Sequence, residues 1–260
     1  MSSDANISYD FDRQLAFAEW GPAAQDTLGR SRVLIVGAGG LGSWMIELLA
    51  RAGVGSLRLA DDDVVTATNL HRQAMYTPAQ AADGVKKVDA AADTIERINP
   101  TVRVEGCPVR FTPDTADELT DEVDIILDGT DNFPTRFTIN DQAVKRAIPW
   151  VFAGAAAAQG QVMAVLPGRT ACLRCLYETP PPKNMEITAQ TVGVINPIVA
   201  AVSSIAVAQA MRILAAAGGA APCLLRLDVW NAVAQRLTAT RRTDCPCCSR
   251  REFDYLERAR

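Results

Sequence analysis

Residues 33–42 read VLIVGAGGLG, a run of aliphatic residues followed directly by glycines. The aliphatic run predicts a buried strand, and the glycines fit the pattern G-x-G-x-x-G at the start of a helix. Glycines suit this place because a Cβ atom would block the approach of the backbone to a phosphate, while the start of the helix offers free N–H groups. The stretch therefore predicts a strand, a phosphate-binding turn and a helix, as in a Rossmann-like fold.

Strands and helices are predicted to alternate through the first half of the chain. The predicted strands cover residues 32–36, 56–60, 102–106 and 123–127, and the predicted helices cover residues 41–52, 85–98 and 134–146. Such alternation is typical of a parallel sheet with helices on both faces. Gly53 is a candidate C-cap of the first of these helices. A further helix is predicted before the first strand, over residues 11–28.

The second half of the chain departs from this alternation. We predict consecutive strands over residues 149–153 and 160–166, a long helix over 192–214, and a closing hairpin with strands over 224–227 and 233–237. The predicted fold class is therefore α/β: a Rossmann-like, mostly parallel twisted sheet that antiparallel C-terminal strands extend. No linker composition separates the two halves, so we expect a single domain over residues 1–260, with a nucleotide-binding half at 30–150 and a second half at 151–260.

Composition and charge argue against several classes of function. The 260 residues are 48% hydrophobic, and the net charge of -4 comes with scattered positive residues, so we expect no nucleic-acid partner. The N-terminus lacks the apolar segment of a signal peptide, and polar residues interrupt the longest apolar stretch, 192–214. We therefore expect a cytoplasmic protein without a membrane span. In that compartment, paired cysteines point to a metal or to catalysis before disulfides.

Three further motifs favour a triphosphate over the NAD or FAD that such a glycine turn usually binds. Arg72 lies in NLHRQ at 69–73, and a guanidinium near the turn can bind a polyphosphate through two N–H groups. Lys86 and Lys87 open the next helix, where either one could reach a phosphate. Asp131 lies in DGTDN at 128–132, directly after a strand, where open α/β sheets bind ligands and a carboxylate suits Mg²⁺.

These residues also have purely structural explanations. Arg72 could be a surface ion-pair partner, Asp131 could cap the following helix, and the glycines could serve only a tight turn.

Asp61, at the end of the second strand, could accept hydrogen bonds from ribose hydroxyls. His71 is the only histidine, so any catalysis that needs an imidazole would depend on this residue.

The cysteines form two pairs that are far apart in the sequence. CLRC at 172–175 and CPCC at 245–248 pair most naturally as Cys172 with Cys175 and Cys245 with Cys248. Four thiolates at such spacings are typical of a structural Zn²⁺ site with closed tetrahedral coordination. Cys247 is an alternative ligand, and a redox dithiol in CLRC is an alternative function. Cys107 and Cys223 are expected in the core as small hydrophobic residues.

Together these motifs resemble the ThiF/MoeB/HesA adenylyltransferases, which are relatives of the ubiquitin-activating enzymes. The resemblance covers nearly the whole chain, and its layout is most similar to that of the molybdopterin-synthase adenylyltransferases. Seven motifs carry it: Arg13-Gln14, GAGGLG at 37–42, DDD at 61–63, NLHRQ, DGTDN, CLRC and the closing cysteines. The resemblance implies use of ATP with Mg²⁺, a structural zinc ion, and a second half at 151–260 that binds both the zinc and a carrier protein.

The resemblance also implies roles for single residues. Gly40 would contact the nucleotide, Asp61 would hold the ribose, and Asp131 would hold Mg²⁺. Arg13 would reach the ATP of the other subunit, because the family works as a symmetric homodimer. Lys86 competes with Lys87 for the phosphate role. The implied nucleotide-binding residues are Gly37, Gly39, Gly40, Gly42, Asp61, Asp63, Asn69, Arg72, Lys87, Asp131 and Asn132, of which Arg72, Lys87 and Asp131, together with Arg13, would be catalytic.

The expected reaction is adenylation of the C-terminal carboxylate of a small ubiquitin-like sulfur-carrier protein. Many relatives carry a loop cysteine that forms a thioester, but Ala189 stands at that position here. We therefore expect the reaction to stop at an acyl-adenylate, which passes to a separate sulfur donor or amine. The alternatives are adenylation of a short peptide in natural-product biosynthesis, a non-catalytic partner of an activating enzyme, and an NAD-dependent oxidoreductase.

Overall fold

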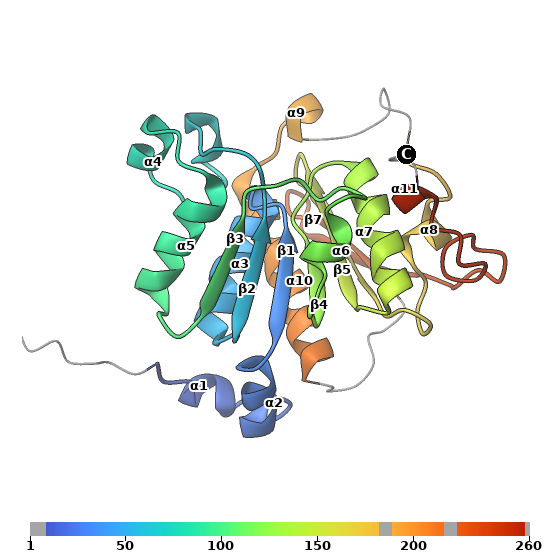
Figure 1. Cartoon of the computed structure of the whole chain (residues 1–260), viewed down its shortest axis with the longest axis horizontal. Coiled ribbons are helices and arrows are strands. Elements are labelled where there is room, and N and C mark those ends of the chain that lie inside the picture. The colour runs from blue at the N-terminus through green and yellow to red at the C-terminus, as the bar shows by residue number, and fades with distance from the viewer. Residues whose placement is uncertain (1–8, 182–188, 216–222, 258–260) are drawn as a thin grey trace, which may run out of the picture.

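A computed structural model describes residues 9–181, 189–215 and 223–257 of the chain (Figure 1). Within these ranges the strands form one sheet of eight, in the order β3-β2-β1-β4-β5-β6-β7-β8. The strands are β1 (Arg32–Val36), β2 (Ser56–Ala60), β3 (Arg103–Cys107), β4 (Ile125–Asp128), β5 (Trp150–Ala156), β6 (Gln159–Val165), β7 (Cys223–Asp228) and β8 (Val233–Thr238).

Helices connect and cover these strands. The longer helices are α2 (Gly21–Leu28), α3 (Gly40–Ala52), α5 (Lys87–Ile98), α7 (Phe133–Arg146) and α10 (Asn196–Leu214). The short ones are α1 (Asp12–Leu15), the 3₁₀ helix η1 (Ala67–Asn69), α4 (Pro78–Ala82), α6 (Ala116–Leu119), α8 (Leu173–Leu176), α9 (Ala189–Val192) and α11 (Asp254–Glu257). Of these short elements, only α1 falls within a predicted helix, because few turns carry too little periodic pattern.

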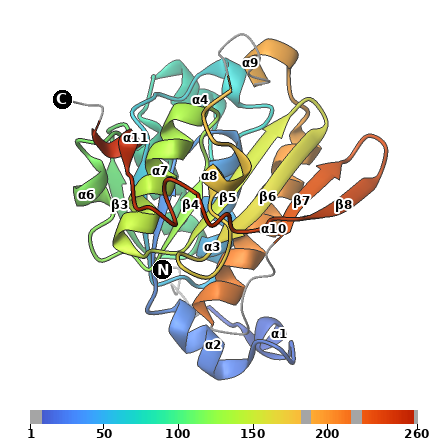
Figure 2. The same cartoon turned by 90° about the vertical axis from the view of Figure 1, so that its right-hand side faces the viewer.

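The sheet changes from parallel to antiparallel along its length. Strands β1 to β5 pair in parallel. The pairs β5–β6, β6–β7 and β7–β8 are antiparallel, and Figure 2 shows the β7–β8 hairpin extending beyond β6 at one edge. The predicted α/β fold class, including its antiparallel C-terminal extension, is confirmed.

The two largest hydrophobic cores lie on opposite faces of the sheet. Side chains of β1 alternate between them, with Val33 and Ile35 facing α3, α5 and α10, and with Leu34 and Val36 facing α6 and α7. This alternation follows from the two-residue period of a strand, and helices on both faces explain why the whole aliphatic run is buried. The start of α3 is thereby fixed directly beyond the carboxyl end of β1.

The predicted helix over residues 11–28 is wrong, because two short helices occupy that stretch. Gly21 has a φ of +67°, and Pro22 follows it in the first turn of α2. Proline supplies no N–H and restricts the preceding residue, so it begins a helix rather than continuing one. Gly53 does end α3 in the left-handed conformation with a φ of +83°, as predicted.

Several other boundaries differ from prediction by a few residues. The strands predicted over 102–106 and 123–127 shift to β3 and β4, so Asp128 is the last residue of β4. The strand predicted over 149–153 continues to Ala156, because register with β6 overrides the weak strand propensity of glycine and alanine. Cys107 and Cys223 are half-buried at strand ends. Cys107 packs against the core on the α6 and α7 face, as predicted in part, whereas Cys223 does not belong to a core cluster.

Helix α10 is long and apolar enough to span a membrane by length and composition, with a hydropathy of 1.6. It lies against β5 and β6 through Ile198, Val202 and Ala206, which have no exposed surface. The predicted buried helix is confirmed on this face, although it begins at Asn196 rather than at residue 192. Pro197 in its first turn explains the later start.

Candidate active site

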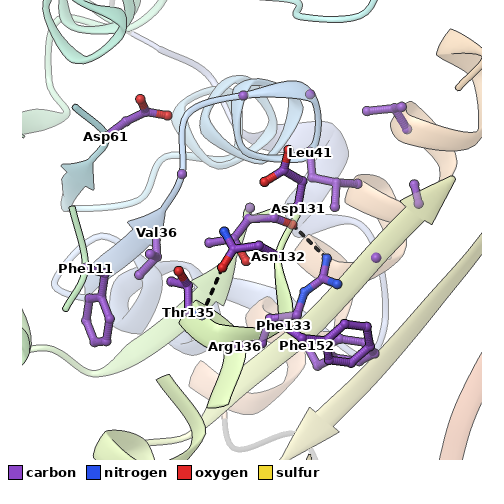
Figure 3. A pocket seen from close by; sticks show the side chains of 18 of the residues that line it. Val36, Leu41, Asp61, Phe111, Asp131, Asn132, Phe133, Thr135, Arg136 and Phe152 are labelled. Atoms are coloured by element: carbon purple, nitrogen blue, oxygen red, sulfur yellow. Dashed lines mark hydrogen bonds between the residues drawn. The ribbon is translucent and has the colours of Figure 1, made fainter. Parts of the chain in front are cut away.

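A cavity of about 1250 Å³ opens at the carboxyl ends of the parallel strands (Figure 3). Its volume exceeds the roughly 300–1,000 Å³ that is typical of a site for one small ligand. One end lies at the glycine turn, and the other extends along β5 and β6 to β7. The predicted residues that line it are Gly37, Gly39, Gly40, Asp61, Asp63, Asn69, Arg72, Lys87, Asp131 and Asn132.

The glycine turn needs its glycines for close backbone contacts. Gly37 has a φ of +86°, and a Cβ atom there would lie 2.9 Å from the carbonyl oxygen of Gly129. A Cβ atom on Gly42 would lie 1.8 Å from the carbonyl oxygen of Gly37. Gly42 therefore holds α3 against the turn and does not line the cavity. No side chain caps the start of α3, which leaves its N–H groups to a ligand.

The carboxylate of Asp61 is built into the glycine turn. Its Oδ2 accepts a hydrogen bond from the backbone N–H of Ala38 over 2.7 Å, and its Oδ1 accepts one from the N–H of Asp63 over 2.9 Å. The side chain is 9% exposed, at the edge of the cavity. Asp61 thus fixes the distance between the ends of β1 and β2, whatever it also binds.

The two candidate lysines point to different places. Lys87 is buried in the cavity wall, with Nζ lying 2.7 Å from Asp63 Oδ2 and 3.7 Å from Asp61 Oδ1. Lys86 does not line the cavity, and its Nζ donates to the carbonyl oxygen of Asp62 over 2.6 Å. The structure therefore brings Lys87, and not Lys86, to the other candidate residues.

Asn69 and Arg72 lie on and after η1, opposite the glycine turn. Asn69 Oδ1 accepts from the N–H of Thr66 over 3.1 Å, which closes a capping box around η1. Arg72 Nη1 donates to the carbonyl oxygen of Thr68 over 2.7 Å, and no ion pair involves Arg72 among the described residues. A Cβ atom on Gly40 would lie 3.9 Å from Arg72 Nε, so the guanidinium is in van der Waals range of the start of α3. The alternative of a surface ion pair therefore fails within the described chain. His71 is exposed and does not line the cavity.

Asp131 and Asn132 divide two roles between them. Asn132 is the N-cap of α7, and its Oδ1 accepts from the N–H of Thr135 over 3.0 Å. Asp131 is not the cap, so that alternative is wrong. Its exposed carboxylate lines the cavity near Leu41, as Figure 3 shows. An exposed carboxylate facing a cavity supplies the oxygen ligands that Mg²⁺ prefers.

Arg136, which lines the cavity, and its buried partner Asp128 are residues that sequence reasoning missed. Asp128 has no exposed surface, and its Oδ2 accepts from Arg136 Nε over 3.0 Å. Burial raises the pKa of Asp128 above its ordinary value, while Arg136 and hydrogen bonds from Thr130 act in the opposite direction. The eight-residue spacing between the two residues gave no local signal, because only the turn into α7 brings them together.

Gln73 is a second missed residue. It is 4% exposed, lines the cavity, and has an Oε1 atom with no hydrogen-bond partner among the described residues. Gln73 is the last residue of the NLHRQ motif, but nothing in the sequence indicated that its side chain is buried. Its Nε2 lies near Gly39, and an unpaired buried amide oxygen in the cavity wall is suited to a ligand that donates a hydrogen bond.

Arg13 lies far from this cavity. The adjacent Gln14 donates through Nε2 to the carbonyl oxygen of Ala52, over 3.0 Å, at the end of α3 opposite the glycine turn. Helix α3 has 13 residues and is therefore roughly 20 Å long. The structure does not bring Arg13 to the other candidates within one chain.

The four predicted thiol ligands lie close together beside α7. The Sγ atoms of Cys172, Cys175, Cys245 and Cys248 all lie within 4.8 Å of one another. Neighbouring Sγ atoms are 3.9 Å, 3.6 Å and 3.5 Å apart. Zinc–sulfur bonds of about 2.3 Å in a tetrahedron place sulfurs about 3.8 Å apart, so the residues fit Zn²⁺.

The fifth cysteine of this region has a different environment. Cys247 lies outside the four-thiol cluster, and Asn140 Nδ2 donates to its Sγ over 3.3 Å. Asn140 Oδ1 accepts from the N–H of Leu173 over 2.8 Å, so one amide on α7 holds both cysteine segments. Such outer hydrogen bonds orient ligands in metal sites.

Comparisons with known proteins agree on one family. The ThiF family model matches residues 11–247. "Sulfur carrier protein ThiS adenylyltransferase" of Bacillus subtilis is 37% identical over 95% of this chain and 73% of its own length. "Sulfur carrier protein adenylyltransferase" of Thermus thermophilus is also 37% identical, over 92% of this chain and 89% of its own. "SAMP-activating enzyme E1" of Haloferax volcanii is 33% identical over 99% of this chain and 94% of its own.

Solved structures show the same fold at lower identity. E. coli MccB with ATP superimposes with a TM-score of 0.76 at 20% sequence identity, covering 87% of this chain and 69% of that one. E. coli MccB with "MccA-N7isoASN" gives a TM-score of 0.76 at 19% identity, with the same coverage. These likenesses concern the arrangement of the chain.

Proposed function

Because the chain belongs to the ThiF family and is an adenylyltransferase, we propose that it adenylates the C-terminal carboxylate of a small ubiquitin-like sulfur-carrier protein. One observation carries the proposal: a single cavity joins a glycine turn, Arg72, Lys87 and Asp131 at one end to a small-residue floor at the other. The cavity is larger than a site for one small ligand, which supports binding of ATP together with a polypeptide tail.

The proposed reaction needs no acid or base from the protein. One oxygen of the carboxylate attacks the α-phosphorus of ATP and forms the acyl–O–P bond. The bond from the α-phosphorus to the α,β-bridging oxygen breaks, and its electron pair leaves on pyrophosphate. The carboxylate is already ionised near neutral pH, so no proton has to move. This explains why a site without a histidine suffices.

The chain's own residues would align the reactants and balance charge. Arg72 and Lys87 would bind the phosphates of ATP, and the uncapped start of α3 would bind a phosphate through its N–H groups. Asp131 would hold Mg²⁺, which supplies charge neutralisation at the phosphates when bound. Asp61 would hold the turn and present its edge to the ribose. Positioning and electrostatics of this kind account for most of the catalysis in such transfers.

The second end of the cavity favours a slender tail. Its floor includes Gly154 and Ala156 of β5, whose side-chain positions face the cavity. A Cβ atom on Gly154 would lie 3.4 Å from Arg136 Nη2, so a larger residue here would crowd the guanidinium. We expect an extended chain with small residues next to its carboxylate to bind along this floor. The relatives at 37% identity are named for sulfur carriers, whereas the MccB structures, at 19–20%, support only a shared fold, so the short-peptide alternative ranks second.

The product is proposed to remain an acyl-adenylate. Ala189 opens α9, and no cysteine lies between Cys175 and Cys223. Without a thiol in this segment, the activated tail would pass to a separate sulfur donor or amine. Intact-mass and non-reducing gel analysis after reaction with ATP and a carrier should show no thiol-reducible adduct. An adduct mapped to this segment would contradict the proposal.

A homodimer is proposed for the intact enzyme, in the cytoplasm. Arg13 cannot reach the cavity of its own chain, so the role implied for it would need a second copy. Phe17, four residues further on, is 59% exposed and could pack against that copy. The four-thiol cluster would hold a structural Zn²⁺ that joins the C-terminal segment to α8.

A substrate panel tests the proposal. The protein and ATP are incubated with a ubiquitin-like carrier ending in Gly-Gly, with the same carrier ending in an amide, and with short peptides. Mass spectrometry should detect an AMP adduct only on the free-carboxylate carrier. Adenylation confined to the short peptides would contradict the carrier proposal and favour the alternative substrate.

A further inference from the structure

Arg136 is a buried cation that lines the proposed active-site cavity, beyond the residues that would hold ATP and Mg²⁺. It lies on the second turn of α7 and is 7% exposed. The rings of Phe133 and Phe152 flank its guanidinium, with their centroids 5.4 Å and 5.3 Å from Cζ. Figure 3 shows the guanidinium between Asp131 and these two rings. Such stacking holds the plane of an arginine in one orientation.

The hydrogen bonds of Arg136 account for only part of its donors. Nε donates to Asp128 Oδ2 over 3.0 Å. Nη2 donates to the carbonyl oxygens of Thr130 and Ala153, over 2.7 Å and 3.0 Å. A guanidinium has five N–H groups, so the two on Nη1 have no partner within the described ranges. Nη1 is not among the fully buried atoms that lack a partner, and Arg136 lines the cavity, so these two donors are open to an acceptor in the cavity.

The fixed groups around Arg136 place Nη1 at the junction of the two ends of the cavity. Thr130, whose carbonyl accepts from Nη2, directly precedes Asp131 on the nucleotide side. Ala153, the other acceptor, directly precedes Gly154 at the start of the floor on β5. The proposed reaction brings a carboxylate and the α-phosphate together at this junction. Arg72 and Lys87 already supply cations on the phosphate side, so the anion left for Nη1 is the carboxylate.

We propose that Arg136 Nη1 binds one oxygen of the substrate's C-terminal carboxylate and thereby aims the other oxygen at the α-phosphorus. This inference rests on the proposed function. Asp128 balances the charge of the guanidinium and fixes its orientation, so the carboxylate meets a preorganised donor rather than a mobile one. Arg136 is then a specificity residue for a free carboxylate as well as a catalytic one.

The test compares binding of two carriers that differ only at the C-terminus. One ends in a free carboxylate and the other in an amide, and each is titrated into the protein with an ATP analogue that cannot be cleaved between the α- and β-phosphates. A charge-assisted hydrogen bond predicts that the wild type prefers the carboxylate by about 10-fold or more. Arg136→Lys keeps the positive charge but loses the planar guanidinium with its fixed N–H donors. This variant should lower the preference to about 3-fold or less. Affinity for the nucleotide analogue should stay within about 3-fold.

Arg146→Lys is the matched control, because Arg146 lies on the same helix and pairs with Asp117 at the surface. It should keep the wild-type preference. Arg136→Lys with an unchanged preference would overturn the role of Arg136 while leaving the proposed function intact. A wild type that adenylates no carrier would overturn both.

A second measurement does not depend on the variant folding. A crystal structure of the wild-type protein with the nucleotide analogue and the free-carboxylate carrier should place a carboxylate oxygen within hydrogen-bond distance of Nη1, about 3 Å. Ordered density with the carboxylate out of contact with Arg136 would overturn the inference.

Discussion

The ammonium group of Lys87 lies 2.7 Å from Asp63 Oδ2, inside the wall of the cavity. Lys87 is 5% exposed, whereas the side chain of Asp63 is largely exposed. Both residues line the cavity, so the buried ammonium group of Lys87 lies next to the space that a ligand would fill. Asp61, at 3.7 Å from the same nitrogen, adds a second negative neighbour. A lysine held in this way can exchange a carboxylate partner for a phosphate without moving far.

Lys87→Met should lower the affinity for ATP by about 10-fold or more, because a charge-assisted contact with phosphate is lost. Lys86→Met is the matched control: Lys86 does not line the cavity and its Nζ donates to the carbonyl of Asp62, so ATP affinity should change less than about 2-fold. Isothermal titration calorimetry on both variants, after circular dichroism confirms their folding, measures this. An equal loss in the two variants would contradict the assignment to Lys87.

Gly42→Ala should destabilise the protein by about 2–3 kcal/mol or more, because its Cβ atom would meet a backbone oxygen at 1.8 Å. Gly39→Ala is the comparison, since a Cβ there meets only the end of Gln73 at 3.8 Å. That variant should unfold within about 1 kcal/mol of the wild type and lose mainly nucleotide affinity. Urea denaturation of both would measure the difference, and similar stabilities would show that α3 can retreat from the turn.

Cys245→Ser should lose bound zinc, and Cys247→Ser should keep it. The first removes one corner of the four-thiol cluster, and the second removes only the sulfur that Asn140 contacts. Loss of the metal should lower stability by about 3 kcal/mol or more, which corresponds to roughly 6–12 °C in Tm for a chain of this size. Plasma mass spectrometry on the two purified variants measures the zinc content of each. Zinc retained in Cys245→Ser and lost in Cys247→Ser would exchange the roles of the two cysteines.

Tyr76 makes stability depend on alkaline pH. Its hydroxyl donates to the carbonyl oxygen of Ala38 over 2.6 Å, and burial, helped by Asp61, raises its pKa well above the ordinary value. Folding therefore favours the protonated form. This contribution is complete below the unfolded pKa of about 10 and is lost as the pH rises through the higher folded value.

Tyr76→Phe should accordingly be less stable near neutral pH, by about 1 kcal/mol, because a buried hydrogen bond is lost. Its stability should fall less steeply than that of the wild type above about pH 10. Urea unfolding at a series of pH values gives both slopes, and tyrosines common to the two proteins cancel in the difference. Parallel slopes would show that Tyr76 has the same pKa in the folded and unfolded states, which would contradict the raised folded pKa.

Much of the fold could be predicted because its decisive residues act locally. The step from Val36 to Gly37 marks both a strand end and a turn, and β1 and β2 follow their predicted limits. The break before α2 was not predicted, because the apolar spacing over 11–28 suits one continuous helix. The pair Gly21–Pro22 is the local signal that ends it. The end of β5 was missed because Gly154, Ala155 and Ala156 become a strand only through pairing with β6.

The residues of the site likewise fall into those that the sequence could predict and those that it could not. Residues that follow strand ends, such as Asp61 and Asp131, could be placed together because parallel strands share one carboxyl edge. Arg136 and Gln73 could not, since their importance depends on burial and on donors or acceptors left unpaired. The choice between Lys86 and Lys87 likewise depended on the direction of two adjacent side chains at the start of α5, which no spacing rule decides.

The most direct test of the account is carboxylate-dependent exchange of pyrophosphate into ATP, measured with a Gly-Gly-ended carrier. The wild type should catalyse exchange only when the carrier has a free carboxylate. Asp131→Ala should slow it by about 100-fold or more, because the proposed Mg²⁺ ligand is gone, while Asp114→Ala, at an exposed aspartate outside the cavity, should stay within about 2-fold. Exchange that is undiminished in Asp131→Ala, or that needs no carboxylate, would contradict the account.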